Sequence, residues 1–140
     1  MSKAFLDTNV VVYASDHNSP VKQRIARKLI NEFSKAEPPC VSTQVLQEFY
    51  SIVTQKLGLE PRMALMLVKS FRVWEIMRTD ADDVEDAIEA SIRWQVSIWD
   101  ALILTSAKKA GCAVVYTEDL NDGQKYGSVK AVNPFRGAHG

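Results

Sequence analysis

Four acidic residues stand at points that an α/β fold would bring together: Asp7, Glu48, Asp100 and Asp119. Asp7 directly follows the apolar residues 4–6, and Asp119 comes shortly after the apolar run 113–116. Carboxylates at close range repel one another, so a converging group needs protons or cations between its members. Mg²⁺ binds few carboxylates together with waters and phosphate oxygens. The pattern therefore favours metal-dependent phosphodiester chemistry.

The apolar periodicity predicts strands that alternate with helices along one domain of residues 1–140. The expected strands cover residues 3–6, 40–42, 73–77, 113–116 and 129–132. The expected helices cover residues 20–33, 43–57, 61–71, 80–95 and 99–110, whereas 7–9 and 117–127 are expected to be a strand end and a loop. Such alternation indicates an α/β fold with a parallel sheet covered on both faces. Open parallel sheets place their sites beyond the carboxyl ends of the strands, where Asp7 and Asp119 stand.

All four acidic residues also have a purely structural interpretation, and for Asp119 it is a solvated acidic loop. Asp7 would suit a turn, but the apolar strand before it favours a metal ligand. Glu48 alone fits an exposed helix face, although the polar stripe to which it belongs can also line a groove. Asp100 fits a first-turn acid as well as a ligand. The helix after it is apolar on all sides, so its carboxylate needs a partner.

Two further acidic segments compete for the metal. Within the loop 117–122, Glu118 and Asp122 are rivals of Asp119. The densest acidic run, residues 80–89, fits the first turn of a helix, where acids are favourable, and it is left out of the site. Two histidines, His17 and His139, show no metal-ligand spacing.

The composition limits the classes of function. The chain has 140 residues, a hydrophobic content of 46% and a formal net charge of +0. It therefore lacks the overall positive field of many nucleic-acid-binding proteins, and any such contact must be local. No leader sequence or apolar run of roughly 20 residues is present, so we expect a cytoplasmic protein without a membrane contact. Cys40 and Cys112 are expected to be buried free thiols.

Short motifs surround each of the four acidic residues. They are FLDTNV at 5–10, QEF at 47–49, WDALI at 99–103 and TEDL at 117–120. In their order and spacing they resemble the motifs of PIN-domain nucleases, and the chain length resembles that of VapC-type toxins. The resemblance implies a three-layer α/β/α sandwich around a parallel sheet of about four or five strands. It also implies a Mg²⁺- or Mn²⁺-dependent endoribonuclease that is inhibited by a cognate antitoxin and forms a homodimer.

The resemblance assigns roles to individual residues. Asp7, Glu48, Asp100 and Asp119 become the acidic metal pocket. Thr8, Asn9 and Thr117 become supporting donors that orient the carboxylates. Asp122 extends the fourth motif and can assist or replace Asp119.

Three other functions are compatible with some of these residues. A phosphatase of the haloacid-dehalogenase type would use Asp7 as nucleophile, but a second Asp is needed two residues later, where Asn9 stands. A PIN-like binding module without catalysis is disfavoured because all four acidic positions are filled. A PIN-like RNA-processing nuclease without an antitoxin stays open.

Two sets of apolar residues are expected to belong mainly to the core. The first is a Met- and Leu-rich helix face that would alternatively accept a partner helix: Met63, Leu65, Met66 and Leu67. The second comprises the tryptophans, which are expected to pack inside rather than stack on bases: Trp74, Trp94 and Trp99.

Overall fold

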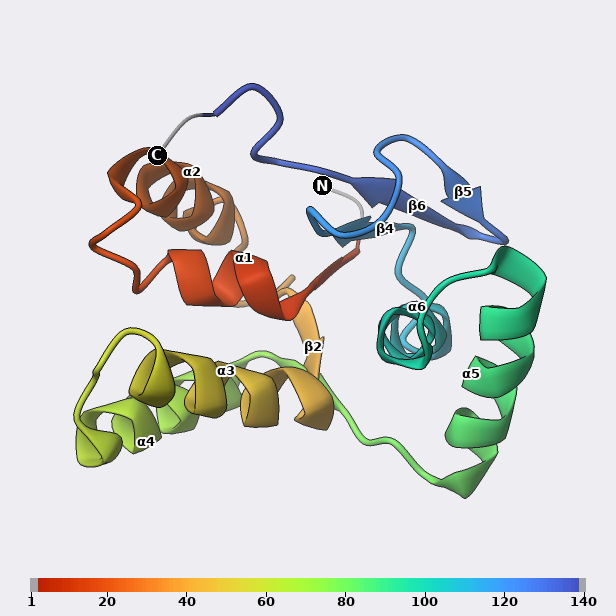
Figure 1. The fold of residues 1–140 in the computed structure, drawn as a ribbon, viewed down its shortest axis with the longest axis horizontal. Coiled ribbons are helices and arrows are strands. Elements are labelled where there is room, and N and C mark those ends of the chain that lie inside the picture. The colour runs from red at the N-terminus through yellow and green to blue at the C-terminus, as the bar shows by residue number, and fades with distance from the viewer. Residues whose placement is uncertain (1–2, 139–140) are drawn as a thin grey trace.

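The computed structural model describes residues 3–138, so His139 lies outside the described residues. One sheet runs through the molecule in the order β3-β2-β1-β4-β6-β5 (Figure 1). Its strands are β1 (Ala4–Leu6), β2 (Cys40–Ser42), β3 (Glu75–Met77), β4 (Val114–Tyr116), β5 (Lys125–Tyr126) and β6 (Val129–Val132). All neighbours pair in parallel except β5 with β6. Because Leu6 pairs with Tyr116, the segments that follow β1 and β4 leave the sheet side by side at one edge.

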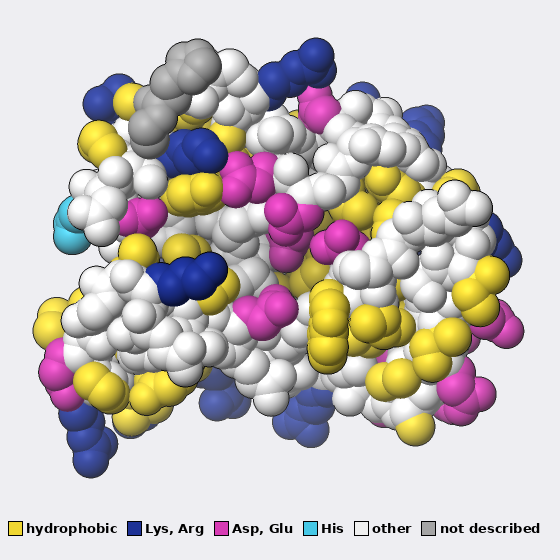
Figure 2. Space-filling model, in the orientation of Figure 1, with side chains coloured by type: hydrophobic (Ala, Val, Ile, Leu, Met, Phe, Trp, Pro, Cys, Tyr) yellow, Lys and Arg dark blue, Asp and Glu magenta, His cyan; other side chains and the backbone are white. Residues whose placement is uncertain are grey.

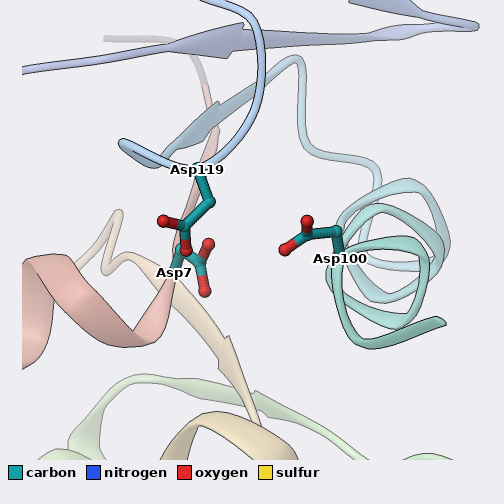
Figure 3. A group of neighbouring side chains, drawn as sticks. All are labelled: Asp7, Asp100 and Asp119. Carbon is teal, nitrogen blue, oxygen red and sulfur yellow. The ribbon is translucent and has the colours of Figure 1, made fainter. Parts of the chain in front are cut away.

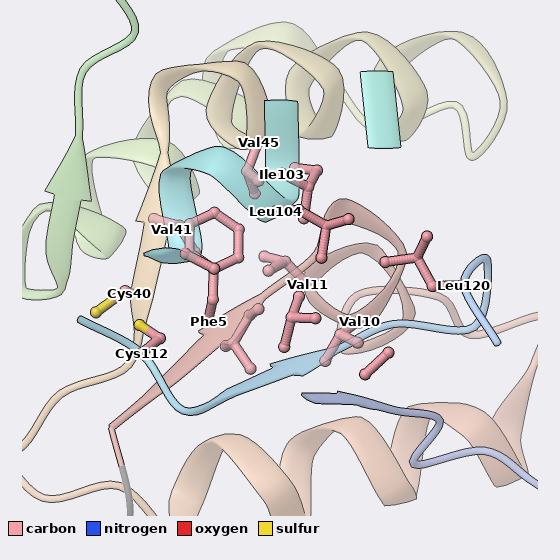
Figure 4. Close-up of a cluster of buried hydrophobic side chains, with 14 of the residues drawn as sticks. Phe5, Val10, Val11, Cys40, Val41, Val45, Ile103, Leu104, Cys112 and Leu120 are labelled. Atoms are coloured by element: carbon pink, nitrogen blue, oxygen red, sulfur yellow. The ribbon is translucent and has the colours of Figure 1, made fainter. Parts of the chain in front are cut away.

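The helices are α1 (Thr8–Tyr13), α2 (Pro20–Asn31), α3 (Thr43–Gln55), α4 (Pro61–Ser70), α5 (Ala81–Trp94) and α6 (Ile98–Lys109). A single 3₁₀ turn, Phe71–Val73, precedes β3. In Figure 4 the helix coloured as α2 lies on one face of the sheet, and those coloured as α3 and α6 lie on the other. The predicted α/β/α sandwich is confirmed, with six strands instead of four or five.

Two elements differ from the prediction. Residues 8–13 form α1 instead of a strand end, although their valines have low helix propensity. Tertiary packing prevails, because α1 buries Val10 and Val11 completely in the core. Residues 125–126 form the short antiparallel edge strand β5 inside the expected loop.

The core lies between the sheet and the helices that cover it. Large buried side chains include Phe5, Val11, Val45 and Ile103 (Figure 4). Helix α6 is buried along most of its length, as expected from its apolar sequence. The two cysteines are buried and free, as predicted.

The core assignment was wrong for several apolar residues. Met63, Leu65 and Met66 of α4 are exposed, with Met66 at 70% of its surface, because only Ala64 of that helix is fully buried. Trp74 and Trp94 pack against the core, but Trp99 is 62% exposed. Within residues 3–138, no helix combines the length and the apolar character that crossing a membrane requires.

Candidate active site

Three of the four predicted acidic residues converge at the carboxyl edge of the sheet. Asp7 follows β1, Asp119 lies in the loop after β4, and Asp100 lies in the first turn of α6. Each offers a carboxylate oxygen, and these oxygens all lie within 4.8 Å of one another (Figure 3). The fold thus brings Asp7 to two acids that lie more than 90 positions later in the sequence.

Asp7 is held by hydrogen bonds to both of its carboxylate oxygens. It is the N-cap of α1, where Oδ1 accepts from the Thr8 backbone N–H at 2.7 Å. The Thr117 hydroxyl donates to Oδ2, also at 2.7 Å. Thr117 Oγ1 in turn accepts the Asp119 N–H at 3.1 Å, so this buried threonine fixes two of the three acids relative to each other.

Asn9 holds the side chain of Asp119. Its Nδ2 donates to Asp119 Oδ2 at 3.0 Å. Its Oδ1 is buried and has no hydrogen-bond partner among the described residues. Buried oxygens are nearly always paired, so this atom marks a point where a bound water or ligand would supply a donor.

Glu48 lines the same cavity but lies outside the group of three converging oxygens. Its Oε1 accepts the Thr8 hydroxyl at 2.6 Å. Thr8 therefore links α3, which carries Glu48, to the N-terminus of α1 beside Asp7. The resemblance implies one pocket for Glu48 and Asp7, and the structure shows Thr8 between them.

The rival acids of the loop 117–122 have other partners. Glu118 accepts the Tyr13 hydroxyl at 2.8 Å and pairs with Lys22 at 3.2 Å. Asp122 accepts the Asn133 N–H and the Arg136 guanidinium, each at 2.8 Å. Asp119 is the member of this loop whose carboxylate joins Asp7 and Asp100.

Burial and mutual repulsion both act on the charges of the cluster. Burial raises the pKa of Asp7 to about 7, although hydrogen bonds from Thr117 and Thr8 oppose the shift. Burial also raises the pKa of Asp119, and the charge of Asp100 adds to it. Asp119 is exposed as a residue, but its carboxylate points inward toward Asp7 in Figure 3. A cation among the three carboxylates would relieve both effects.

The donor set fits Mg²⁺ or Mn²⁺. It consists of hard carboxylate oxygens from three separate segments, and hydrogen bonds from Thr117 and Asn9 hold those of Asp7 and Asp119. Oxygens that share a Mg²⁺ ion at about 2.1 Å lie no more than about 4.2 Å apart, so small side-chain rotations would close the set. Glu48, Thr8 and Asn9 surround these ligands.

The cluster lies in a cavity of about 450 Å³ between α1 and α3. Helix α3 lines it with Gln44, Glu48 and Ile52, and the C-cap residue of α3, Lys56, continues this series of every fourth residue. Helix α1 contributes Thr8, Asn9, Val12 and Tyr13, and Trp99 stands beside Asp100. Figure 2 shows acidic side chains gathered in the hollow at the centre of this face, with hydrophobic side chains at one margin. We call this cavity the groove.

Trp99 and Lys56 belong to the groove but are not assigned to the site by the sequence analysis. Trp99 is expected in the core rather than as a base-stacking platform, and the structure exposes it. Lys56 carries no motif, and its signal was only its place on the helix face of Glu48, two turns further along the chain.

Comparison with known proteins gives a family and a fold. The family model described as the PIN domain matches residues 4–124. No curated protein matches the sequence.

Several solved structures resemble the fold. VapC20 of Mycobacterium tuberculosis, described as a sarcin–ricin loop cleaving toxin, is 21% identical with a TM-score of 0.69, covering 84% of this chain and 90% of its own. A toxin–antitoxin complex from Klebsiella pneumoniae is 17% identical with a TM-score of 0.70, covering 94% and 98%. DNA-bound VapBC from Salmonella typhimurium is 22% identical with a TM-score of 0.65, covering 94% and 97%. At these identities the likeness concerns the fold.

Proposed function

The chain belongs to the PIN-domain family, and we propose that it is a metal-dependent endoribonuclease, the toxin of a toxin–antitoxin pair acting in the cytoplasm. The observation that carries the proposal is the convergence of the Asp7, Asp100 and Asp119 oxygens at the carboxyl edge of the sheet. Because the chain matches the PIN-domain model, the alternative of a haloacid-dehalogenase-type phosphatase is rejected.

The roles of the acidic residues follow from their positions. Asp7, Asp100 and Asp119 would hold Mg²⁺ or Mn²⁺, which when bound polarises a phosphoryl oxygen and lowers the pKa of a water. Glu48 lines the same groove and accepts the Thr8 hydroxyl, and its carboxylate would orient the attacking water. Thr117 holds the Asp7 carboxylate and Asn9 holds that of Asp119, so that both would face the metal. No nucleophilic side chain is needed for this hydrolysis.

The proposed partners are an RNA substrate, a cognate antitoxin and a second copy of the chain. Of the structures compared above, one is described as a toxin–antitoxin complex and another as DNA-bound VapBC. The exposed face of α4, formed by Met63, Leu65 and Met66, offers an apolar surface for an amphipathic antitoxin helix. Light scattering of the purified protein tests the homodimer.

The test of the enzyme is cleavage of a panel of RNAs in Mg²⁺ or Mn²⁺, in EDTA, and with Asp7→Asn. We expect cleavage that requires both the metal and Asp7. Asp86→Asn is the matched control, because it removes the same charge from an exposed site on α5. Metal-independent cleavage, or full activity of folded Asp7→Asn, would contradict the proposal. Failure of folded, metal-loaded protein to cut any RNA would favour a binding module.

A further inference from the structure

Trp99 is the large aromatic residue that the structure leaves open at the groove. Its side chain is 62% exposed, whereas Trp74 stacks on Phe71 and Trp94 packs edge-on against Tyr126. Among the described residues, no aromatic ring stacks on Trp99. Exposed indole surface of this size beside a functional cavity indicates a binding role.

The backbone that carries Trp99 is fixed. Trp99 lies in the first turn of α6, which begins at Ile98 after the Ser97 cap. Its carbonyl oxygen accepts a hydrogen bond from Gln44 Nε2 at 3.3 Å, which joins α6 to the α3 wall of the groove. Ala101 and Leu102, which follow Asp100 in α6, are buried. A ring on such a rigid base loses little conformational freedom when a ligand covers it.

The groove places Trp99 next to the reacting centre. Asp100 is the next residue in the chain, and its carboxylate is part of the cluster. Lys56, a lysine without an ion-pair partner among residues 3–138, lies at the opposite end of α3 from Gln44. Twelve residues of helix separate these two ends, which corresponds to roughly 18 Å. A single strand of RNA that lies along the groove would thus pass Trp99, the acidic cluster and Lys56 in turn.

We propose that Trp99 is a specificity-determining residue whose indole stacks on an unpaired RNA base next to the scissile phosphate. This inference rests on the proposed nuclease function. Bases within a duplex have both faces covered, so stacking on a side chain selects loops, bulges and ends. Every base has an aromatic face, so the selection acts on strandedness more than on sequence.

A nucleotide suits this position better than an apolar protein surface. A protein side chain packed on Trp99 would also remove water from the neighbouring Asp100 and Glu48 carboxylates, at a cost in free energy. A nucleotide covers the ring with its base while its phosphate, together with a divalent cation, faces the acids.

The experiment measures RNA affinity in the Asp7→Asn background, so that binding is separated from cleavage. The probes are a short single-stranded RNA and a fully paired, blunt-ended RNA duplex of the same length, in Mg²⁺. We expect Trp99→Ala to weaken single-strand binding by about 5- to 150-fold and to leave duplex binding unchanged. Trp99→Phe should recover most of the affinity. Tryptophan emission should be quenched by the single strand in the control Trp74→Phe but not in Trp99→Phe.

The outcomes separate the two proposals. Equal single-strand affinity of Trp99→Ala and its parent would overturn the role of Trp99, while metal-dependent cleavage by the wild-type protein would still support the nuclease. A Trp99→Ala protein that binds RNA normally but changes its mass in light scattering would assign Trp99 to a protein interface. If the wild-type protein neither binds nor cuts RNA, both proposals fail.

Discussion

The acids of the loop 117–122 differ in their partners more than in their chemistry. Asp119 points at Asp7, whereas Asp122 accepts hydrogen bonds from Asn133 and Arg136, which hold its pKa below the usual range. Loss of residues that only support metal ligands typically costs about 10- to 100-fold, so loss of a ligand should cost at least that much. We expect Asp119→Asn to reduce the cleavage rate more than about 100-fold and Asp122→Asn much less. Rates at saturating Mn²⁺ decide this, and a larger loss in Asp122→Asn would move the metal site along the loop.

Thr117 is a buried hydroxyl that connects two acids. Thr117→Val keeps the shape but removes the donor to Asp7 Oδ2 and the acceptor for the Asp119 N–H. We expect metal affinity to fall by about 10- to 100-fold. Titration calorimetry with Mn²⁺ measures the affinity directly, and Thr117→Ser should restore it. If valine and serine bind the metal equally, the hydroxyl has no part in holding the site.

The raised pKa of Asp7 makes the stability of the metal-free protein depend on pH. The folded state keeps the proton up to about pH 7, while the unfolded state releases it near its ordinary value of 3.8. The free energy of unfolding therefore falls as pH rises between these two values. Asp7→Asn removes this dependence, so its melting temperature relative to wild type in EDTA should be higher at pH 8 than at pH 5. A constant difference would show that Asp7 is ionised throughout this range.

Among the elements, α5 begins as the sequence predicts. The acidic run is expected in the first turn of a helix, and the structure confirms Asp82 and Asp83 there. It adds a capping box between Asp80 and Asp83 that the sequence analysis does not include. Lys109 of α6 also bonds to Asp83 at 2.8 Å, so the cap joins the two helices.

Asp83→Ala should destabilise the protein by about 1 to 2 kcal/mol at pH 7, because it removes one half of the capping box. The hydrogen bond from Lys109, followed by that from the Asp80 N–H, holds the pKa of Asp83 below 3.8. The stabilisation that the Asp83 carboxylate contributes is therefore fully present above pH 3.8. It is lost as the pH falls through the lower pKa of Asp83 in the folded protein. Urea denaturation should show the variant and wild type converging under strongly acidic conditions. If the difference in free energy of unfolding between variant and wild type persists at low pH, the variant has lost packing and not a charge interaction.

The elements with clear apolar periodicity were predictable, and those decided by tertiary contact were not. Helix α3 and the strand β4 follow from their own sequences. Helix α1 does not, because three consecutive valines favour a strand and only the surrounding core makes them helical. Trp99 was misplaced for the related reason that an apolar neighbourhood in sequence does not say which side of a helix meets the core. The places of Asp7 and Asp119 were predictable because strand ends converge, whereas Glu48 and Asp100 were assigned by the resemblance. The resemblance also gave Thr8 and Thr117 as supporting donors, but their partners are seen only in the structure.

For the whole molecule, the balance of charge has a consequence for RNA binding. The net charge is +0, and five carboxylates line the groove. An RNA phosphate approaching the groove is repelled unless cations offset these charges. We therefore expect RNA binding by the intact protein to depend on a divalent cation and on the lysine at the groove.

Lys56 is the lysine that lines the groove, and its removal should change the salt dependence of binding. Each phosphate neutralised on a single strand contributes about 0.7 to the slope of log affinity against log salt concentration. Lys56→Ala should lower the magnitude of this slope by about that amount, with a similar loss for every RNA sequence, because a phosphate contact carries no sequence information. Lys69→Ala, on the exposed surface of α4, should leave the slope unchanged. Fluorescence anisotropy of a labelled single strand between low and moderate salt in Mg²⁺ measures both slopes. If the two variants share the wild-type slope, the RNA backbone does not pass the Lys56 end of the groove, and the strand must leave the acidic cluster in another direction.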